Sequence, residues 1–432
     1  MSAEIHEGDA LEILRAMPDN SYHGCLTDPP YGLSFMGHGW DHGVPSVDVW
    51  REVLRVLRPG AHVLAFGGTR TFHRLTCAIE DAGLEIRDCM QWLYGSGFPK
   101  SHDVSKAIDK ANGDWRGKAG AVTSDNAAMG GPNYARTPKG EPIAAAAVQW
   151  SGHGTALKPA WEPIIVARKP LDGTVAESVQ RWGCGGLAID ACRIGYASDD
   201  DKAAATAAAQ RACQDQNRGL RTRSNFAEGA GPSTIAPFLE KQELGRWPAN
   251  VILDEEAGAI LDAQGGNRKS TLTGRANPSV AHGHPADPSR SRGSMFGNDQ
   301  ARGNVYADDG GASRFFYCPK ASRSERDAGL EAFDAGQSLY SRGTGLKANG
   351  DGSERSETRN VHPTVKPLAM ARYLARLILP PIPDARMITP FSGSGSEVIG
   401  ALQAGWSHVD GIDSWDVAVR ISRARLAHWV AR

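Results

Sequence analysis

Short apolar runs alternate with helical stretches near both ends of this chain, and this alternation limits its fold more than any other feature. The predicted strands are 24–27, 62–66, 84–93, 387–388 and 408–412. The predicted helices are 49–57, 368–379, 397–404 and 415–429, the first ending before Pro59 and Gly60. Strands separated by helices in this way indicate βαβ units, so we expect an α/β protein with a mostly parallel sheet.

The residues between 101 and 360 have a different character. They include alanine-rich pieces and long pieces rich in glycine, serine, asparagine and arginine. Three apolar segments interrupt them, at 161–168, 246–253 and 314–318. We interpret these as a few added strands joined by long loops, and loops of such length are usually functional or disordered.

Charge and composition exclude several classes of protein. The formal net charge is −1, so a nucleic-acid ligand would have to meet a local basic patch instead of an overall basic field. No apolar run approaches the roughly 20 residues that span a bilayer, and the first residues do not resemble a secretion signal. The seven cysteines include no CxxC pair, so we expect a reduced, cytosolic protein without a zinc ribbon.

Asp28-Pro29-Pro30-Tyr31 follows the predicted strand 24–27 and carries the strongest chemical signal. An aromatic amino group is a poor nucleophile because its lone pair is delocalised into the ring. The Asp28 carboxylate can accept one N–H and the Pro29 carbonyl the other, which aims the lone pair at an incoming group. The prolines fix the turn, and Tyr31 offers a ring for a flipped base. The alternative is an ordinary Pro-Pro turn.

A glycine-rich turn, residues 390–396, lies between a predicted strand and a helix. Its glycines allow close approach of a ligand to the backbone, and the helix that follows offers free N–H groups. Asp413 ends the next strand, about 20 residues downstream, where a carboxylate would hold ribose hydroxyls. Val398 replaces the third glycine of a dinucleotide fingerprint, which disfavours a nicotinamide enzyme. A glycine-rich turn with an unknown ligand remains the alternative.

The segment from His362 to Pro367 leads into the helix predicted at 368–379. Taken alone it has two interpretations. It could contribute to a binding site, or it could only begin the helix, with Thr364 as the cap and Pro367 in the first turn.

Together the three segments resemble the β-group of DNA amino-methyltransferases, in which Asp-Pro-Pro-Tyr precedes the cofactor-binding half. The resemblance covers roughly residues 4–100 and 361–430, with weaker matches at the central apolar segments. It implies a Rossmann-like methyltransferase sheet whose cofactor-binding half is C-terminal, and S-adenosylmethionine as cofactor. It also implies three parts, namely a catalytic half at 1–100, an insertion with target-recognition elements at 101–360 and a cofactor-binding half at 361–432.

The resemblance also implies the roles of individual residues. The catalytic residues would be Asp28, Pro29, Pro30 and Tyr31. The cofactor-binding residues would be Asp9, Ala10, His362, Thr364, Lys366, Phe391, Gly393, Gly395 and Asp413. Transfer would be direct, without a metal or a covalent adduct of the base. One residue departs from the family pattern: Thr389 stands where an acid is usual, so the cofactor amino group would lose an ionic partner there.

The family resemblance predicts methylation of N6 of adenine in double-stranded DNA, because Asp before Pro-Pro favours adenine by analogy. Transfer to N4 of cytosine remains open, and a more distant alternative is a catalytically weak DNA-binding protein. Arg290, Arg292 and Arg302 lie in the glycine- and serine-rich loops and are predicted to contact phosphates, although a solvated charged loop is the default. The resemblance leaves open a homodimer and a role in restriction-modification.

Overall fold

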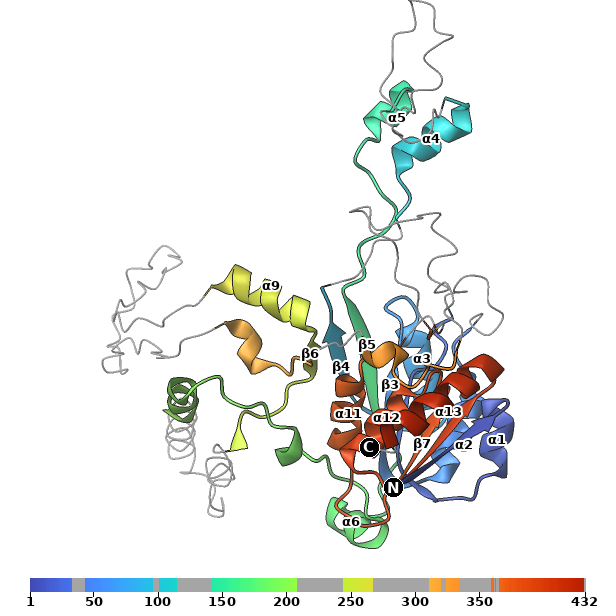
Figure 1. Cartoon of the computed structure of the whole chain (residues 1–432), viewed down its shortest axis with the longest axis vertical. Coiled ribbons are helices and arrows are strands. Elements are labelled where there is room, and N and C mark those ends of the chain that lie inside the picture. Colours follow the sequence, from blue (N-terminus) through green and yellow to red (C-terminus); the bar gives the residue numbers. More distant parts are fainter. Residues whose placement is uncertain are drawn as a thin grey trace, which may run out of the picture. The chain divides into compact units, whose positions relative to one another are not determined.

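The computed structural model describes residues 1–32, 43–95, 101–114, 142–207, 244–266, 311–319, 324–333, 359–360, 362 and 365–430. The chain forms two compact units. The larger comprises Met1–Tyr94 and Glu162–Arg432, and the smaller comprises Gly95–Trp161. Figure 1 traces both along the chain. None of the described helices is long and apolar enough to cross a membrane.

The larger unit is built on a sheet of eight described strands in the order β1-β8-β7-β2-β3-β5-β4-β6. The strands are β1 (Ser2–Glu7), β2 (Tyr22–Thr27), β3 (Leu57–Phe66), β4 (Glu85–Leu93), β5 (Trp161–Arg168), β6 (Val251–Leu253), β7 (Arg386–Pro390) and β8 (His408–Asp413). β5 runs antiparallel to β3. The other described pairs, β1 with β8, β8 with β7, β7 with β2, β2 with β3 and β4 with β6, are parallel. The expected α/β fold with a mostly parallel sheet is confirmed.

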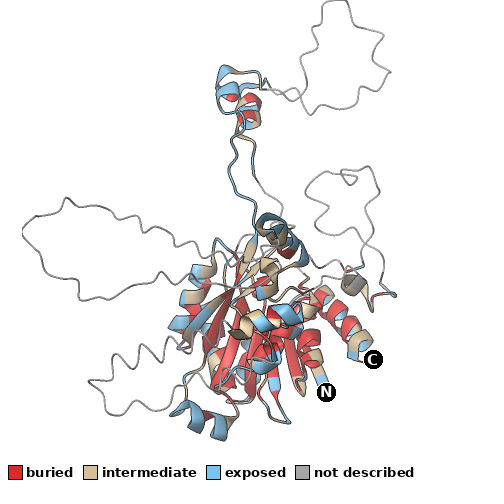
Figure 2. Ribbon diagram, turned by 90° about the vertical axis from the view of Figure 1, so that its left-hand side faces the viewer, coloured by how far each residue is buried: buried red, intermediate tan, exposed pale blue. Residues whose placement is uncertain are grey.

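Helices cover both faces of this sheet (Figure 1). One core joins the sheet to α11 (Leu368–Leu377), α12 (Ser396–Ala404) and α13 (Asp416–Val430). The other joins it to α1 (Ala10–Ala16), α2 (Val47–Val56) and α3 (Phe72–Asp81). Figure 2 shows that buried residues concentrate in the strands and in the helix faces turned toward them. All six residues of β2 are buried, as expected of a central strand covered on both sides.

The structure also contains other helices from the middle of the chain. They are α4 (Val104–Asn112), α5 (Ala145–Gln149), α6 (Val175–Trp182), α9 (Glu255–Gly265), α10 (Ser324–Asp327) and the short 3₁₀ helices Asp190–Cys192 and Ala312–Phe315. Within the smaller unit, the buried Asp109 carboxylate of α4 accepts hydrogen bonds of 3.0 Å from the backbone N–H groups of Ile143 and Ala144, just before α5.

Two of the three central apolar segments predicted from the sequence contribute strands, β5 and β6. The third forms the 3₁₀ helix Ala312–Phe315 and an isolated bridge between Tyr317 and Ile252 of β6. The structure therefore extends the sheet with residues from the middle of the chain. The division of function at residues 100 and 360 remains a prediction.

One boundary differs from the expected one. α2 ends at Val56, and β3 starts at Leu57 and continues through Pro59 and Gly60, which were expected to separate helix from strand. The pairing of β2 with β3 shifts register between Tyr22 and Gly24. Pro59 and Gly60 lie opposite this shift, at an irregularity of the ladder. A proline is tolerated at such a position, because no regular ladder hydrogen bond is required of it.

Candidate active site

The Asp-Pro-Pro-Tyr turn follows the carboxyl end of β2, and the glycine-rich loop follows the carboxyl end of β7. β2 and β7 are neighbouring parallel strands, so both segments leave the sheet at the same edge. Thr27 is the last residue of β2 and Pro390 is the last residue of β7. The Thr27 hydroxyl donates a hydrogen bond to the Pro390 carbonyl. Two motifs from opposite ends of the chain are thereby held side by side.

Four polar side chains meet at the Asp-Pro-Pro-Tyr turn. The Tyr31 hydroxyl lies 2.8 Å from Oδ1 of Asp28 and 3.1 Å from Oε2 of Glu162. Nζ of Lys366 lies 2.9 Å from Oδ2 of Asp28 and 3.1 Å from the same Glu162 oxygen. It also lies 3.1 Å from the Tyr31 hydroxyl. With Lys366 only 5% exposed, this is a nearly buried cluster of one cation, two carboxylates and one phenol.

The charges in this cluster determine the state of its members. Burial lowers the pKa of Lys366, but the charges of Asp28 and Glu162 outweigh burial and raise that pKa above its ordinary value. Burial and the same two carboxylates raise the pKa of Tyr31 well above its ordinary value. Lys366 therefore stays an ammonium and Tyr31 stays a neutral hydrogen-bond donor. Both hold Asp28 as an acceptor with a defined orientation.

The ring of Tyr31 has a defined place as well. It packs on the backbone at Gly68, where an added Cβ would come within 3.1 Å of the ring. Nζ of Lys366 lies 5.5 Å from the centre of the Tyr31 ring and 4.8 Å from that of Phe66. The Thr71 hydroxyl donates to the Tyr31 carbonyl at 2.6 Å, which fixes the end of the turn. Stacking of Tyr31 on a base remains a prediction.

The glycine-rich loop has the backbone of a tight ligand-facing turn. Phe391, Gly393 and Gly395 all have positive φ, at 58°, 51° and 80°. A Cβ on Gly393 would lie 3.0 Å from Nε2 of His362, so a side chain there would press against that ring. His362 is thus next to the loop, as the sequence predicted for a residue of the cofactor site. Gly395 caps α12, which begins at Ser396.

Asp413, at the end of β8, is tied to the same loop. Its Oδ2 accepts a hydrogen bond from the Gly393 N–H at 2.8 Å, and its Oδ1 accepts one from the Trp415 N–H at 2.9 Å. Burial raises the pKa of this carboxyl, although the two N–H donors act in the opposite direction. A carboxylate has about four acceptor positions. Asp413 therefore keeps acceptor positions free while it orders the loop; its contact with ribose hydroxyls stays a prediction.

The predicted cofactor-binding residues Asp9 and Ala10 follow Gly8, whose backbone contacts that of Asp413. The Gly8 N–H donates to the Asp413 carbonyl at 2.9 Å, because β1 and β8 pair up to Glu7 and Asp413. The Asp9 carboxylate caps α1 by accepting from the N–H groups of Leu11 and Glu12 at 2.9 and 3.1 Å. Ala10 is buried as the first residue of that helix. Asp9 and Ala10 are therefore brought to the strand end that carries Asp413.

Unpartnered buried atoms show that the loop can take a polar ligand such as S-adenosylmethionine. The hydroxyls of Thr389 and Ser392 and one carboxylate oxygen of Glu397 are buried and have no hydrogen-bond partner among the described residues. Native proteins leave few such groups unsatisfied. All three lie in or directly beside the glycine-rich turn 390–396, where the sequence predicts cofactor binding. The residues present fit a ligand with hydroxyl and ammonium donors.

Some predicted site residues cannot be placed. Thr364, Arg290, Arg292 and Arg302 lie outside the described residues. Their proposed contacts with cofactor and phosphates stay predictions. Two residues of the site were missed by the sequence reasoning, Glu162 and Glu397. Glu162 stands at the start of an apolar strand next to Pro163, and Glu397 stands on a helix of otherwise apolar and small residues. An acid in such an apolar setting is the signal that could have found both.

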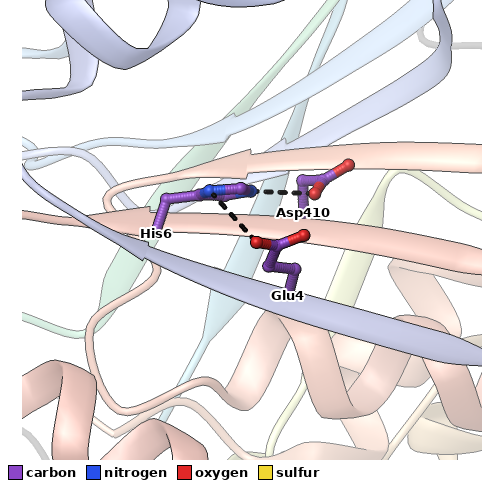
Figure 3. Close-up of side chains that lie close together, drawn as sticks. All are labelled: Glu4, His6 and Asp410. Atoms are coloured by element: carbon purple, nitrogen blue, oxygen red, sulfur yellow. Dashed lines mark hydrogen bonds and ion pairs between the residues drawn. The ribbon is translucent and has the colours of Figure 1, made fainter.

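A second polar group, formed by Glu4, His6 and Asp410, ties β1 to β8 (Figure 3). Nε2 of His6 lies 2.9 Å from Asp410, and Nδ1 lies 3.8 Å from Glu4. Their ligand atoms lie within 4.8 Å of one another, a spacing compatible with a metal ion. However, Asp410 also accepts from the Tyr22 hydroxyl at 2.8 Å and lies 3.4 Å from the cationic Arg386. We interpret this group as a hydrogen-bonded network that anchors the edge strand.

Known proteins resemble this chain over different lengths. The Type II methyltransferase M.HindIII of Haemophilus influenzae is 21% identical in an alignment of 227 residues, and the match covers 41% of this chain and 64% of that protein. The match thus spans less than two thirds of that relative. The M1.HpyAVI structure is 10% identical, covers 98% of both chains and has a TM-score of 0.36. The cytosine-N4-specific PvuII DNA methyltransferase is 11% identical over 98% of this chain and 86% of its own, with a TM-score of 0.40. These two structural similarities are too low to support a conclusion.

The family assignment rests on a longer match. The model of the N6/N4 methyltransferase family, described as DNA methylase, matches residues 22–414. That range begins in β2 and ends just after Asp413, so it contains both the Asp-Pro-Pro-Tyr turn and the glycine-rich loop. This chain therefore belongs to the N6/N4 DNA methylase family, whose methyl donor is S-adenosylmethionine, the cofactor expected from the sequence.

Proposed function

We propose that this protein transfers a methyl group from S-adenosylmethionine to N6 of adenine in double-stranded DNA. The observation that supports this most is the position of Asp28. Its carboxylate is held by Tyr31 and Lys366 in a turn that lies beside the glycine-rich loop. An acceptor fixed next to a cofactor loop is what an amino nitrogen needs to be oriented toward a methyl group.

The residues of the turn would act on the base as follows. Asp28 accepts one N–H of the amino group and the Pro29 carbonyl accepts the other, which draws the nitrogen lone pair out of conjugation. Tyr31 and Lys366 keep Asp28 in place, so the geometry exists before the base arrives. Tyr31 also offers a ring to the base. The bound S-adenosylmethionine supplies the electrophilic methyl group.

The cofactor would lie along the loop and the end of β8. Asp413 holds the ribose hydroxyls, and the Asp9-Ala10 turn lies next to the adenine. Phe391, Gly393 and Gly395 give backbone access, and His362, Thr364 and Lys366 close over the methionine end. Residues 1–100 then form the catalytic half, 361–432 the cofactor-binding half, and 101–360 carry target recognition.

Identification of the methylated base tests this proposal. Unmethylated duplex DNA is incubated with the protein and S-adenosylmethionine that carries a trideuterated methyl group, and the DNA is digested to nucleosides for mass spectrometry. We expect labelled N6-methyladenine, and none from an Asp28→Asn control. Labelled N4-methylcytosine would show that cytosine is the target, since the same geometry serves both amino groups. If neither labelled nucleoside is found, the proposed methyltransferase activity is contradicted.

A further inference from the structure

Glu397 is a buried carboxylate that the catalytic cluster does not use. It lies in the first turn of α12, two residues after Gly395, and is 4% exposed. Its Oε1 has no hydrogen-bond partner among the described residues. A polar atom left unpaired in the interior costs free energy, and the cost is larger for a charged group. Such an atom beside a ligand loop points to a partner that arrives with the ligand.

The nearby cations are already paired with other groups. Lys366 makes its ion pairs with Asp28 and Glu162, not with Glu397. Arg425 donates to the carbonyl and hydroxyl of Ser394 and to the hydroxyl of Ser396. Neither cation forms an ion pair with Glu397 within the described part of the chain. Both cations favour the carboxylate form of Glu397 through their charge, but its Oε1 is left without a hydrogen-bond donor among the described residues.

The titration of Glu397 agrees with an unmet partner. Burial, and next the charge of Asp28, raise its pKa to about 7, although Lys366 opposes them. An incoming cation would favour the carboxylate form and lower that pKa. The charges of Asp28 and Lys366 thus reach Glu397, which stands in the helix that follows the glycine-rich loop.

We propose that Glu397 binds the α-ammonium group of S-adenosylmethionine, an inference that rests on the proposed function. The cofactor carries two cationic centres, the sulfonium and the ammonium. Of these two centres, only the ammonium has N–H donors that can satisfy the unpartnered Oε1. If the methyl group faces Asp28, the amino-acid end on the same sulfur atom would be available to Glu397, on which the charges of Asp28 and Lys366 act. Glu397 then supplies the charge that Thr389 does not.

Calorimetry with two ligands tests this assignment on the full chain. S-adenosylhomocysteine carries the ammonium but no sulfonium charge, and methylthioadenosine lacks the amino-acid end altogether. For Glu397→Gln we expect S-adenosylhomocysteine to bind about ten- to a hundredfold more weakly, as for loss of a charge-assisted hydrogen bond. Methylthioadenosine should bind both proteins within about twofold. Glu80→Gln, the same change at an exposed acid of α3, is the control.

A second measurement needs only the wild-type protein and covers a variant that fails to fold. Titrations at pH 7 in buffers of different ionisation enthalpy report protons released on binding. Because the pKa of Glu397 is about 7, S-adenosylhomocysteine should release a fraction of a proton, at most about half, and methylthioadenosine should release none. Equal proton release for both ligands would overturn the proposal.

Other outcomes separate the remaining explanations. If Glu397→Gln binds both S-adenosylhomocysteine and S-adenosylmethionine, titrated in the same way, as tightly as the wild-type protein, the carboxylate has no ligand. An equal loss of affinity for S-adenosylhomocysteine and methylthioadenosine would mean that Glu397 only maintains the conformation of the loop. A loss of affinity for S-adenosylmethionine alone would mean that Glu397 interacts with the sulfonium. Each of these results overturns the assignment of Glu397 to the ammonium group but does not contradict the proposed methyltransferase function. Failure of the wild-type protein to bind either ligand would instead contradict the proposed function itself.

Discussion

The ammonium nitrogen of Lys366 lies 2.9 Å from a carboxylate oxygen of Asp28, and the same nitrogen lies 3.1 Å from Glu162. One buried cation is thus shared by two carboxylates. If Asp28 turns toward an amino group, Lys366 stays paired through Glu162, and no unpaired buried charge results. Glu162 is therefore expected to support catalysis without touching the base.

Glu162→Gln tests this sharing. With one carboxylate left, Lys366 should bind Asp28 more tightly and compete with the amino group of the base. We expect the single-turnover rate of methyl transfer to fall by at least about tenfold, the equivalent of one charge-assisted hydrogen bond. Cofactor affinity should change little. Glu52→Gln, which removes the partner of Arg55 on α2, is the control. An unaltered rate would assign Glu162 to packing alone.

Asp413 should set cofactor affinity. Replacing it with alanine removes the ribose acceptor and frees the N–H of Gly393, so S-adenosylmethionine should bind more weakly by roughly 1.5–3 kcal/mol. Calorimetry measures this directly, with the exposed Asp416→Ala as control. Unchanged affinity would place the cofactor elsewhere. As a companion, Thr389→Asp should keep or raise the affinity if this chain follows the family geometry.

Asp410 gives a prediction for stability against pH. Burial raises its pKa, but hydrogen bonds from His6 and Tyr22 outweigh burial, and the pKa is lower than usual. A lowered pKa in the folded state means that the stabilisation is present above the unfolded value, near 4, and is lost as pH falls through the folded value. Urea unfolding should therefore show Asp410→Asn destabilised at pH 7. That difference should shrink below about pH 4, and a constant difference would contradict this account.

The arginines of the central region test how DNA is held. If Arg290, Arg292 and Arg302 each meet one phosphate, changing all three to alanine should make the plot of log affinity against log salt shallower by up to about three units. Cofactor affinity should be untouched. DNA binding measured over a range of salt concentrations decides the matter. Identical affinity and salt slope would mean that these side chains only face solvent.

The sequence predicted the central strands well and the edge poorly. Strands such as β2 and β8 are mostly buried and therefore have apolar runs that sequence periodicity detects. β1 lies at the edge of the sheet, where only Ile5 is buried, so its residues alternate too weakly to be recognised. The predicted boundary between α2 and β3 was wrong, because a register shift accommodates Pro59 inside the strand β3.

The site was predictable only where motifs carry it. Asp28, Gly393 and Asp413 stand in segments whose spacing is recognisable, and the structure brings the loop and Asp413 together. Glu162 belongs to no motif that can be recognised in the sequence. Its role follows from β5 pairing antiparallel with β3, which places it beside Lys366, and such long-range pairing cannot be derived from local pattern.

Asp28→Ala provides the most direct test of the central claim, that this carboxylate positions the amino group. Lys366 would keep Glu162 as a partner, so the fold and the cofactor site should survive. Single-turnover transfer to DNA is measured together with S-adenosylmethionine affinity by calorimetry. We predict a loss in transfer of about a hundredfold or more, as for removal of one preorganised polar group, with cofactor affinity retained. Transfer above about a tenth of the wild-type rate would contradict the assignment.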